Sequence, residues 1–233
     1  MLQIQNGRVL TMAGKTFENG QVLIENGKIK SVGEYLSIPN AKAEVIDARG
    51  GWILPGLIEA HCHIGITEEK KGFEGDDCNE VNQPVIPYLK ALDAVNPMDS
   101  AFHNALSAGI TAVMVGPDSS NVVGGQFLVM KTHGRVMDQM VVKEPAAMKV
   151  AFGENPKTNY SGQNKVPSTR MSVGALLRDE LTRAQNYRSR KETAQQKGEA
   201  FEEDYQMECW LPVLTGKIPM KAHVHRADDI LTA

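Results

Sequence analysis

Apolar and polar residues alternate over short runs in the first part of the chain, as they do in strands with one buried face. Residues 22–25 and 28–32 are two such runs, separated only by Asn26 and Gly27. Because an Asn-Gly pair readily takes the positive φ angles of a two-residue turn, these runs predict a β-hairpin. The same pattern predicts a second hairpin, of residues 3–5 and 8–10 around Asn6-Gly7, and a strand over residues 42–46.

Beyond residue 52 the pattern changes to mostly apolar runs, which are typical of strands buried in a parallel sheet. Between the first two runs, Asn96 and Gly109 mark the start and the end of a helix. A second helix is predicted from about Ser172, and its charged continuation over residues 188–204 is interpreted as a solvated helical face or an excursion. Strand, helix and strand in succession form a βαβ unit, which has parallel strands. The five predicted strands cover residues 52–63, 110–115, 126–130, 147–152 and 219–225.

These elements predict an α/β protein in two parts. Residues 1–52 form a small β-domain, and residues 53–233 form an α/β barrel or a doubly wound sheet. No G-x-G-x-x-G opens a helix after the first strand, and no G-x-x-x-x-G-K-[ST] is present. Dinucleotide and P-loop nucleotide binding therefore lose their main support.

Composition changes this picture little. The 233 residues are 42% hydrophobic and 23% charged, with a formal net charge of -3. These values are those of an ordinary globular protein and give no electrostatic reason to expect a nucleic acid or an anionic membrane as a partner. No apolar stretch approaches the roughly 20 residues of a membrane span, and the N-terminus lacks the pattern of a secretory signal. The three cysteines are far apart, so we expect a reducing, cytoplasmic location and no disulfide framework.

His61 and His63 are the residues that most clearly indicate chemistry. On a strand, residues i and i+2 project from the same face, so both imidazoles point one way and Cys62 points the other. If the apolar run is a barrel strand, the pair lies at its C-terminal end, where barrel enzymes place their active sites. Two neighbouring imidazoles can hold one divalent ion. An H-x-H is only moderately specific on its own, and an incidental pair is the alternative.

The surrounding sequence resembles the amidohydrolase superfamily. The likeness is carried by residues 55–63, Pro-Gly-Leu-Ile-Glu-Ala-His-Cys-His, which follow a β-rich segment, and by residues 221–229. It extends more loosely over the chain between them and is nearest to imidazolonepropionase-like members. The resemblance implies a small N-terminal β-sandwich segment and a metal-dependent (β/α)8 TIM-type barrel, of which the chain supplies about the first five strands. It also implies a small-molecule substrate with a C–N bond.

By this resemblance His61, His63 and His223 bind the metal, which is expected to be zinc, with iron or manganese as alternatives, as one ion or two. Glu154 and Lys149 compete for the position on the fourth strand. A carboxylate at Glu154 can reach an ion without modification, whereas some family members bridge two metals with a carboxylated lysine where Lys149 stands. We prefer Glu154 as the ligand and keep Lys149 as its rival.

Three further residues are candidates for the site. His225 lies two residues beyond His223, on the same face, and is predicted to contact substrate, with a surface-facing strand end as the alternative. His133, in a loop after the third strand, is a second substrate-binding candidate, with a plain loop residue as the alternative. Glu59 shares a face with the two histidines of the first strand and is expected to support them from deeper in the barrel.

The predicted reaction is hydrolysis of an amide. A bound divalent ion lowers the pKa of its water to about 7 and polarises the scissile carbonyl, and a carboxylate passes the proton to the leaving nitrogen. The family's catalytic Asp on strand eight has no counterpart before Ala233, so no catalytic acid is assigned. Because a complete barrel takes roughly 250 residues, we expect the sequence to be part of a longer protein. An aminoacylase or dipeptidase on the same scaffold, a non-catalytic binding or assembly protein, and a homo-oligomer all stay open.

Overall fold

The computed structural model describes residues 1–36 and 43–233. Its contacts divide the chain into two compact units, Met1–Leu57 and Ile58–Ala233, which are described separately. In this division the short strand at Trp52–Ile53 belongs to the first unit. The domain assignment with a boundary after residue 52 stays a prediction.

The first unit is a small five-stranded sheet in the order β3-β2-β1-β4, with β5 also paired to β1. Strand β2 runs antiparallel to both β1 and β3, whereas β4 and β5 run parallel to β1. The strand predicted over residues 42–46 is β4, although residue 42 lies outside the described residues. The strands are β1 (Leu2–Leu10), β2 (Thr16–Glu25), β3 (Lys28–Gly33), β4 (Glu44–Asp47) and β5 (Trp52–Ile53). One separate sheet is observed, and its place in a β-sandwich stays a prediction.

The hairpin predicted at Asn26-Gly27 is confirmed. It joins β2 to β3, and the two turn residues have φ angles of 52° and 72°, as a type I′ turn requires. The hairpin predicted around Asn6-Gly7 is wrong, because β1 continues through both residues. Asn6 has a φ of 58°, and the register of β1 against β2 shifts at this point. The positive φ therefore produces a bulge within one strand and no turn.

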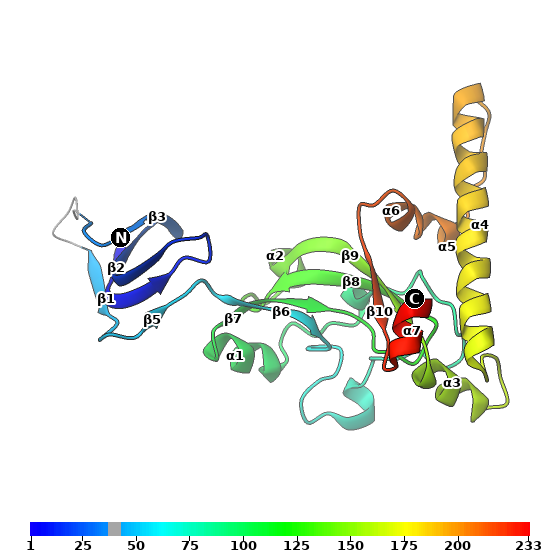
Figure 1. Ribbon diagram of the computed structural model, residues 1–233, viewed down its shortest axis with the longest axis horizontal. Helices are drawn as coiled ribbons and strands as arrows, with labels where there is room; N and C mark the ends of the chain where they lie inside the picture. Colours follow the sequence, from blue (N-terminus) through cyan, green and yellow to red (C-terminus); the bar gives the residue numbers. More distant parts are fainter. Residues whose placement is uncertain (37–42) are drawn as a thin grey trace. The chain divides into compact units, whose positions relative to one another are not determined.

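The second unit is built on a curled five-stranded sheet in the order β10-β9-β8-β7-β6 (Figure 1). Strand β8 runs antiparallel to β7 and β9, and β10 runs parallel to β9. The expectation of five parallel strands is therefore wrong at the third strand. Residues 116–122 are too few for the crossover of about a dozen residues that a parallel pair needs. The strands are β6 (Leu57–Cys62), β7 (Ile110–Val115), β8 (Val123–Lys131), β9 (Val141–Ala151) and β10 (Met220–His223).

The helix predicted between the first two strands of this sheet is α1 (Ser100–Ser107), and it begins later than expected. Asp99 is its N-cap and accepts the amide of Ala101 at 3.1 Å. Asn96, the predicted cap, accepts the amide of Met98 in a preceding turn. The remaining helical segments are η1 (Gly72–Gly75), η2 (Ala91–Asp93), α2 (Met137–Met140), α3 (Glu154–Ser161), α4 (Arg170–Lys197), α5 (Tyr205–Glu208), α6 (Leu211–Leu214) and α7 (Ala227–Thr232).

The long helix α4 confirms the prediction of a helix that continues into the charged run, as far as Lys197; residues 198–204 of that run lie beyond the helix. Thr169 and Ser172 form a capping box at its start, and Gly198, with a φ of 67°, ends it. Its buried residues include Leu177 and Tyr187, which pack against β9 and against Trp210. Among the helices of the described residues, α4 included, none is both long and apolar enough to cross a membrane.

The two faces of the sheet carry different side chains. On the outer face, apolar clusters join β9 to α4 and join β7 and β8 to α1. On the inner face, the register pairs Phe127 of β8 with Ala147 of β9, and Lys149 of β9 with Lys221 of β10. Because residues paired in register share a face, as do residues two apart on one strand, Phe127, Lys149, Lys221 and His223 all belong to the inner face.

Candidate functional site

The two histidines of β6 lie at the inner face of the sheet. The His61 ring is centred 5.4 Å from the ring of His63 and 5.4 Å from that of Phe127. Cys62 lies between them on the other face, where its thiol is directed at the carbonyl of Met114. The alternation expected for a strand therefore holds, and it brings the two imidazoles together.

The ring of His63 is oriented by a hydrogen bond to backbone. Its Nδ1 lies 2.7 Å from the carbonyl oxygen of Gly116, and a carbonyl can only accept, so this nitrogen carries the proton. In the neutral ring, Nε2 then has its lone pair free. Histidine ligands of metals are typically fixed in this way by a partner on the other nitrogen.

Asp118 is a member of this group that the sequence did not reveal. It follows β7 in the loop that begins at Gly116, and its Oδ1 lies 3.7 Å from Nε2 of His63. Burial opposes its ionisation, but a hydrogen bond from Asn79 and the charge of His63 lower the pKa of Asp118 overall. The sequence did contain one signal for Asp118: it is a polar residue that follows the predicted strand over residues 110–115, and barrel enzymes place site residues just after their strands.

Burial lowers the pKa of His61 to about 4, and the charges of Lys149, Lys221 and His63 act in the same direction. The imidazole is therefore neutral at physiological pH, which is the form that binds metals. The same cause, burial, followed by the charges of His225 and Lys149, lowers the pKa of His223.

Lys149 is the most unusual side chain of the site. It is fully buried, and among the described residues its Nζ has no hydrogen-bond partner. Burial, together with the charge of Lys221, lowers the pKa of Lys149 to about 8, and Asp118 opposes this shift. The Nζ lies 5.8 Å from the centre of the Phe127 ring. A buried amine without a partner costs stability, so its retention indicates a role in the site.

His223 is the last residue of β10, and like Lys149 it has a buried nitrogen atom. Its Nε2 is shielded from solvent and has no hydrogen-bond partner within the described residues. The charges of Lys149 and Asp118 act on His223 as well as on His61, so all four residues share one electrostatic environment. The structure thus brings His223 to the inner face together with the histidines of β6.

Glu154 and Lys149, the two candidates from this part of the chain, differ in burial, and which of them serves the site stays a prediction. Glu154 is the first residue of α3, and its side chain is 72% exposed, with Oε1 4.0 Å from Nε2 of His225. Gly153, with a φ of 75°, ends the alternation of β9 before Glu154. His225 is itself 50% exposed, and its ring is centred 4.4 Å from that of His223. The structure places Lys149 among the buried donors, and Glu154 with His225 at their exposed margin.

His133 lies away from the inner-face histidines His61, His63 and His223. Because β8 runs antiparallel to β7 and β9, the loop after it lies at the opposite end of the sheet from His61 and His63. There His133 lines a separate pocket together with His103 of α1. Glu59 accepts the backbone amide of His61 at 2.9 Å, and its expected support of the two histidines stays a prediction.

The described part of the chain has no group of three or more histidine, cysteine, aspartate or glutamate side chains positioned to hold a metal ion. The donor atoms nevertheless fit such an ion in kind. Two of them, Lys149 Nζ and His223 Nε2, are buried without partners among the described residues, and His63 presents its Nε2 on the side of the Asp118 carboxylate. Neutral imidazoles of this type are the usual ligands of zinc.

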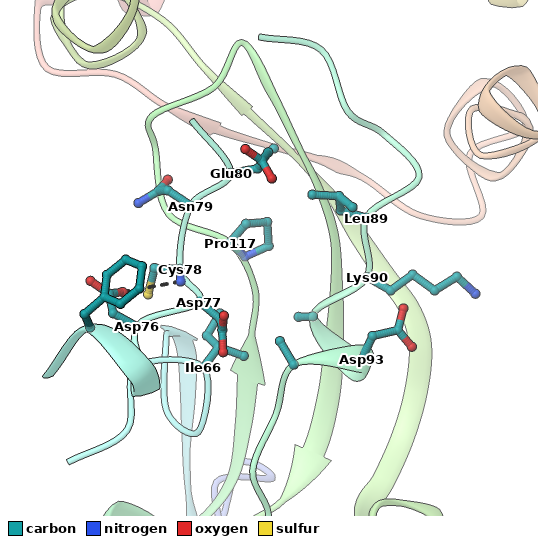
Figure 2. A pocket seen from close by; sticks show the side chains of 14 residues that line it. Ile66, Asp76, Asp77, Cys78, Asn79, Glu80, Leu89, Lys90, Asp93 and Pro117 are labelled. Atoms are coloured by element: carbon teal, nitrogen blue, oxygen red, sulfur yellow. Dashed lines mark hydrogen bonds between the residues drawn. The ribbon is translucent and has the colours of Figure 1, made fainter. Parts of the chain in front are cut away.

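A pocket of about 420 Å³ adjoins the group (Figure 2). Pro117 and Gly124 form the shared wall: a Cβ placed on Gly124 would lie 3.2 Å from Cγ of Lys149. Lys90 extends away from the other labelled side chains in Figure 2 and pairs with Glu144 at 3.3 Å. The acidic residues of the lining are Asp76, Asp77, Glu80 and Asp93.

Comparisons with known proteins agree with the resemblance seen in the motifs. The crystal structure of an amidohydrolase from Thermotoga maritima MSB8 is 44% identical and matches with a TM-score of 0.93, over 100% of this chain and 60% of that one. The amidohydrolase tasK from Hapsidospora irregularis is 27% identical over 91% of this chain and 24% of its own length. A dihydroorotase from Pelobacter propionicus is 27% identical over 54% of this chain and 24% of its own. No family model matches the chain.

The chain belongs to the amidohydrolase superfamily. It spans 24% of the length of each of the two curated relatives and 60% of the Thermotoga structure. The mixed α/β architecture, a curled sheet and a separate smaller sheet, is consistent with part of an amidohydrolase fold. The assignment to an imidazolonepropionase-like branch stays a prediction.

Proposed function

We propose that this chain carries part of the active site of a metal-dependent hydrolase that cleaves a carbon–nitrogen bond in a small molecule. One observation carries the proposal: within the part of the chain that the structure describes, Lys149 Nζ and His223 Nε2 are buried without hydrogen-bond partners, on the sheet face that also bears His61 and His63. Relatives named amidohydrolase and dihydroorotase support the type of reaction.

His61, His63 and His223 are the proposed ligands. A divalent ion bound to them would supply an activated water at neutral pH and would polarise a carbonyl. We propose zinc as the metal, because neutral imidazoles suit it, with iron, which they also suit, and manganese, which oxygen ligands favour, as alternatives. Asp118 adds a negative charge beside His63, since its lowered pKa keeps it ionised at neutral pH.

Lys149 is proposed as the residue from β9 that completes the ligand set, in place of Glu154. With a pKa of about 8, a substantial fraction of its amine is neutral in weakly alkaline solution. The neutral nitrogen can bond the carbon of CO2 and lose a proton, which turns a partnerless cation into an anionic oxygen donor. The resemblance to family members with a carboxylated lysine supports this role, and His225 and Glu154 remain candidates for substrate contacts at the exposed margin.

Two alternatives differ in what the site acts on. An aminoacylase or dipeptidase would use the same donors on an N-acyl amino acid or a peptide, and a non-catalytic binding protein would use none of them. A panel of cyclic amides, N-acyl amino acids and dipeptides separates the first alternative from the proposal.

Metal analysis tests the proposal against the binding protein. The purified protein is stripped with a chelator, reconstituted with Zn²⁺, desalted and analysed for bound metal. We expect one or two ions per chain, and hydrolysis of a panel substrate only by the reconstituted sample. A clean absence of metal after reconstitution would overturn the proposal.

A further inference from the structure

A second lysine, Lys221, lies at the inner face beside the proposed site. It belongs to β10, two residues before His223, and so shares that histidine's face. It pairs in register with Lys149 of β9. The side chain of Lys221 therefore projects from β10, the strand that carries the proposed ligand His223.

The ammonium group of Lys221 reaches across the inner face of the sheet to β6, the strand that leads to His61 and His63. It donates a hydrogen bond to the carbonyl oxygen of Ala60, the residue before His61 on β6. On the way it lies 3.4 Å from Sδ of Met114 on β7 and 5.0 Å from the centre of the Phe127 ring on β8. One side chain thus contacts β6, β7 and β8, and its own strand pairs with β9.

Strands β6 and β10 are the two ends of the sheet order, so no ladder of backbone hydrogen bonds joins them directly. Their separation depends on the curl of the sheet and on side chains that cross it. A hydrogen bond from an ammonium group is roughly twice as strong as one between neutral groups. Lys221 is half-buried, and its ammonium group has both the Ala60 carbonyl and the Phe127 ring as neighbours in this position.

We propose that Lys221 is a positioning residue that holds β6 and β10 at the separation that the donors of His61 and His223 require. The inference rests on the proposed function for its consequence, metal affinity. Its structural part, the cross-sheet link between Lys221 and the backbone of β6, stands without a metal.

The test uses Lys221→Met, which keeps the length and the apolar stem but removes the donor, and Lys221→Arg, which keeps both charge and reach. Lys217→Met is the matched control, because Lys217 is exposed. Two measurements are made on each protein: hydrogen exchange of the β6 backbone amides without metal, and the Kd for Co²⁺ by titration. Circular dichroism establishes that each variant is folded.

We expect the amides of β6 to exchange faster in Lys221→Met than in the wild type, while those of β8 are unchanged. The Kd for Co²⁺ rises about 10–100-fold, the usual effect of removing a group that orients metal ligands. Lys221→Arg restores most of both properties, and Lys217→Met changes neither.

Unchanged exchange in β6 overturns the proposal, and so does a Lys221→Met variant that does not fold, because Lys221 would then serve the fold as a whole. A loss of affinity that Lys221→Arg fails to rescue also contradicts it. If β6 exchanges faster but neither wild type nor variants bind Co²⁺, the proposed function fails and the cross-sheet link stands.

Discussion

Replacing Lys149 with methionine should stabilise the protein. The side chain is fully buried and has no partner in the described structure, and burial lowers its pKa from 10.5 to about 8. One unit of pKa corresponds to about 1.36 kcal/mol, so this shift amounts to a penalty of about 3 kcal/mol on the charged form. Lys149→Met has nearly the same length and removes that penalty.

The pH dependence has a definite sign. Because the pKa of Lys149 is lower in the folded state, between about 8 and 10.5 the unfolded state binds more protons and stability rises with pH. The penalty is complete below about pH 8. The advantage of Lys149→Met over the wild type should therefore be about 3 kcal/mol at pH 7 and about 1 kcal/mol at pH 10.

The assay is urea unfolding of metal-free protein, followed by tryptophan fluorescence. Trp210 is fully buried in the second unit, and Trp52 is 65% exposed in the first. A Trp52→Phe background leaves Trp210 as the only reporter, so the transition of the second unit is seen alone. Lys157→Met, at an exposed position, is the control and should stay within about 0.5 kcal/mol of the wild type. A destabilised Lys149→Met variant, or an advantage that does not change with pH, would refute the reasoning.

Three further predictions concern single residues of the second unit. Glu180→Ala should cost about 1–3 kcal/mol in urea unfolding, because it removes the acceptor of the Trp210 indole N–H, which Glu180 now accepts at 3.0 Å. Glu180→Gln keeps an acceptor and should recover most of this loss. Equal losses in the two variants would contradict the prediction. Gly116→Ala should cost about 1–3 kcal/mol, since its Cβ would lie 2.2 Å from the buried Phe127 ring, and an unchanged midpoint would contradict it. The imidazole of His61 should titrate by NMR with a midpoint near 4, and a midpoint near the ordinary 6.5 would show that burial and the lysine charges are not felt.

The sequence predicted a strand near each strand of the larger sheet, because each is a run of mostly apolar residues. The first was predicted over residues 52–63, whereas β6 is Leu57–Cys62 and Trp52–Ile53 pairs with β1 in the smaller sheet. It did not predict the direction of β8, since a strand buried on both faces reads the same in either direction. The short connection over residues 116–122 was the signal that a parallel crossover was impossible. In the smaller sheet, an Asn-Gly pair made a turn at Asn26 but a bulge at Asn6, because positive φ angles serve both.

The same limits apply to the site. The i, i+2 rule was sufficient to pair His61 with His63, and the family resemblance was sufficient to add His223. Burial could not be read from the sequence, so the exposed Glu154 was preferred to the buried Lys149. Asp118, which follows β7, belongs to a loop whose return path the sequence does not define. The place of His133 could not be predicted for the same reason as the direction of β8: the reversed strand carries the loop of His133 to the other end of the sheet.

The central claim is that the histidines of β6 bind a metal ion, and Co²⁺ titration of two double variants tests it most directly. His61→Ala/His63→Ala removes two of the three proposed ligands, and His103→Ala/His133→Ala removes two histidines from the other end of the sheet. We predict that the first double variant loses the visible absorption of bound Co²⁺ and at least about 100-fold in affinity, since only one of the three proposed imidazole ligands is left. The second should bind as the wild type does. Equal binding by both would contradict the claim.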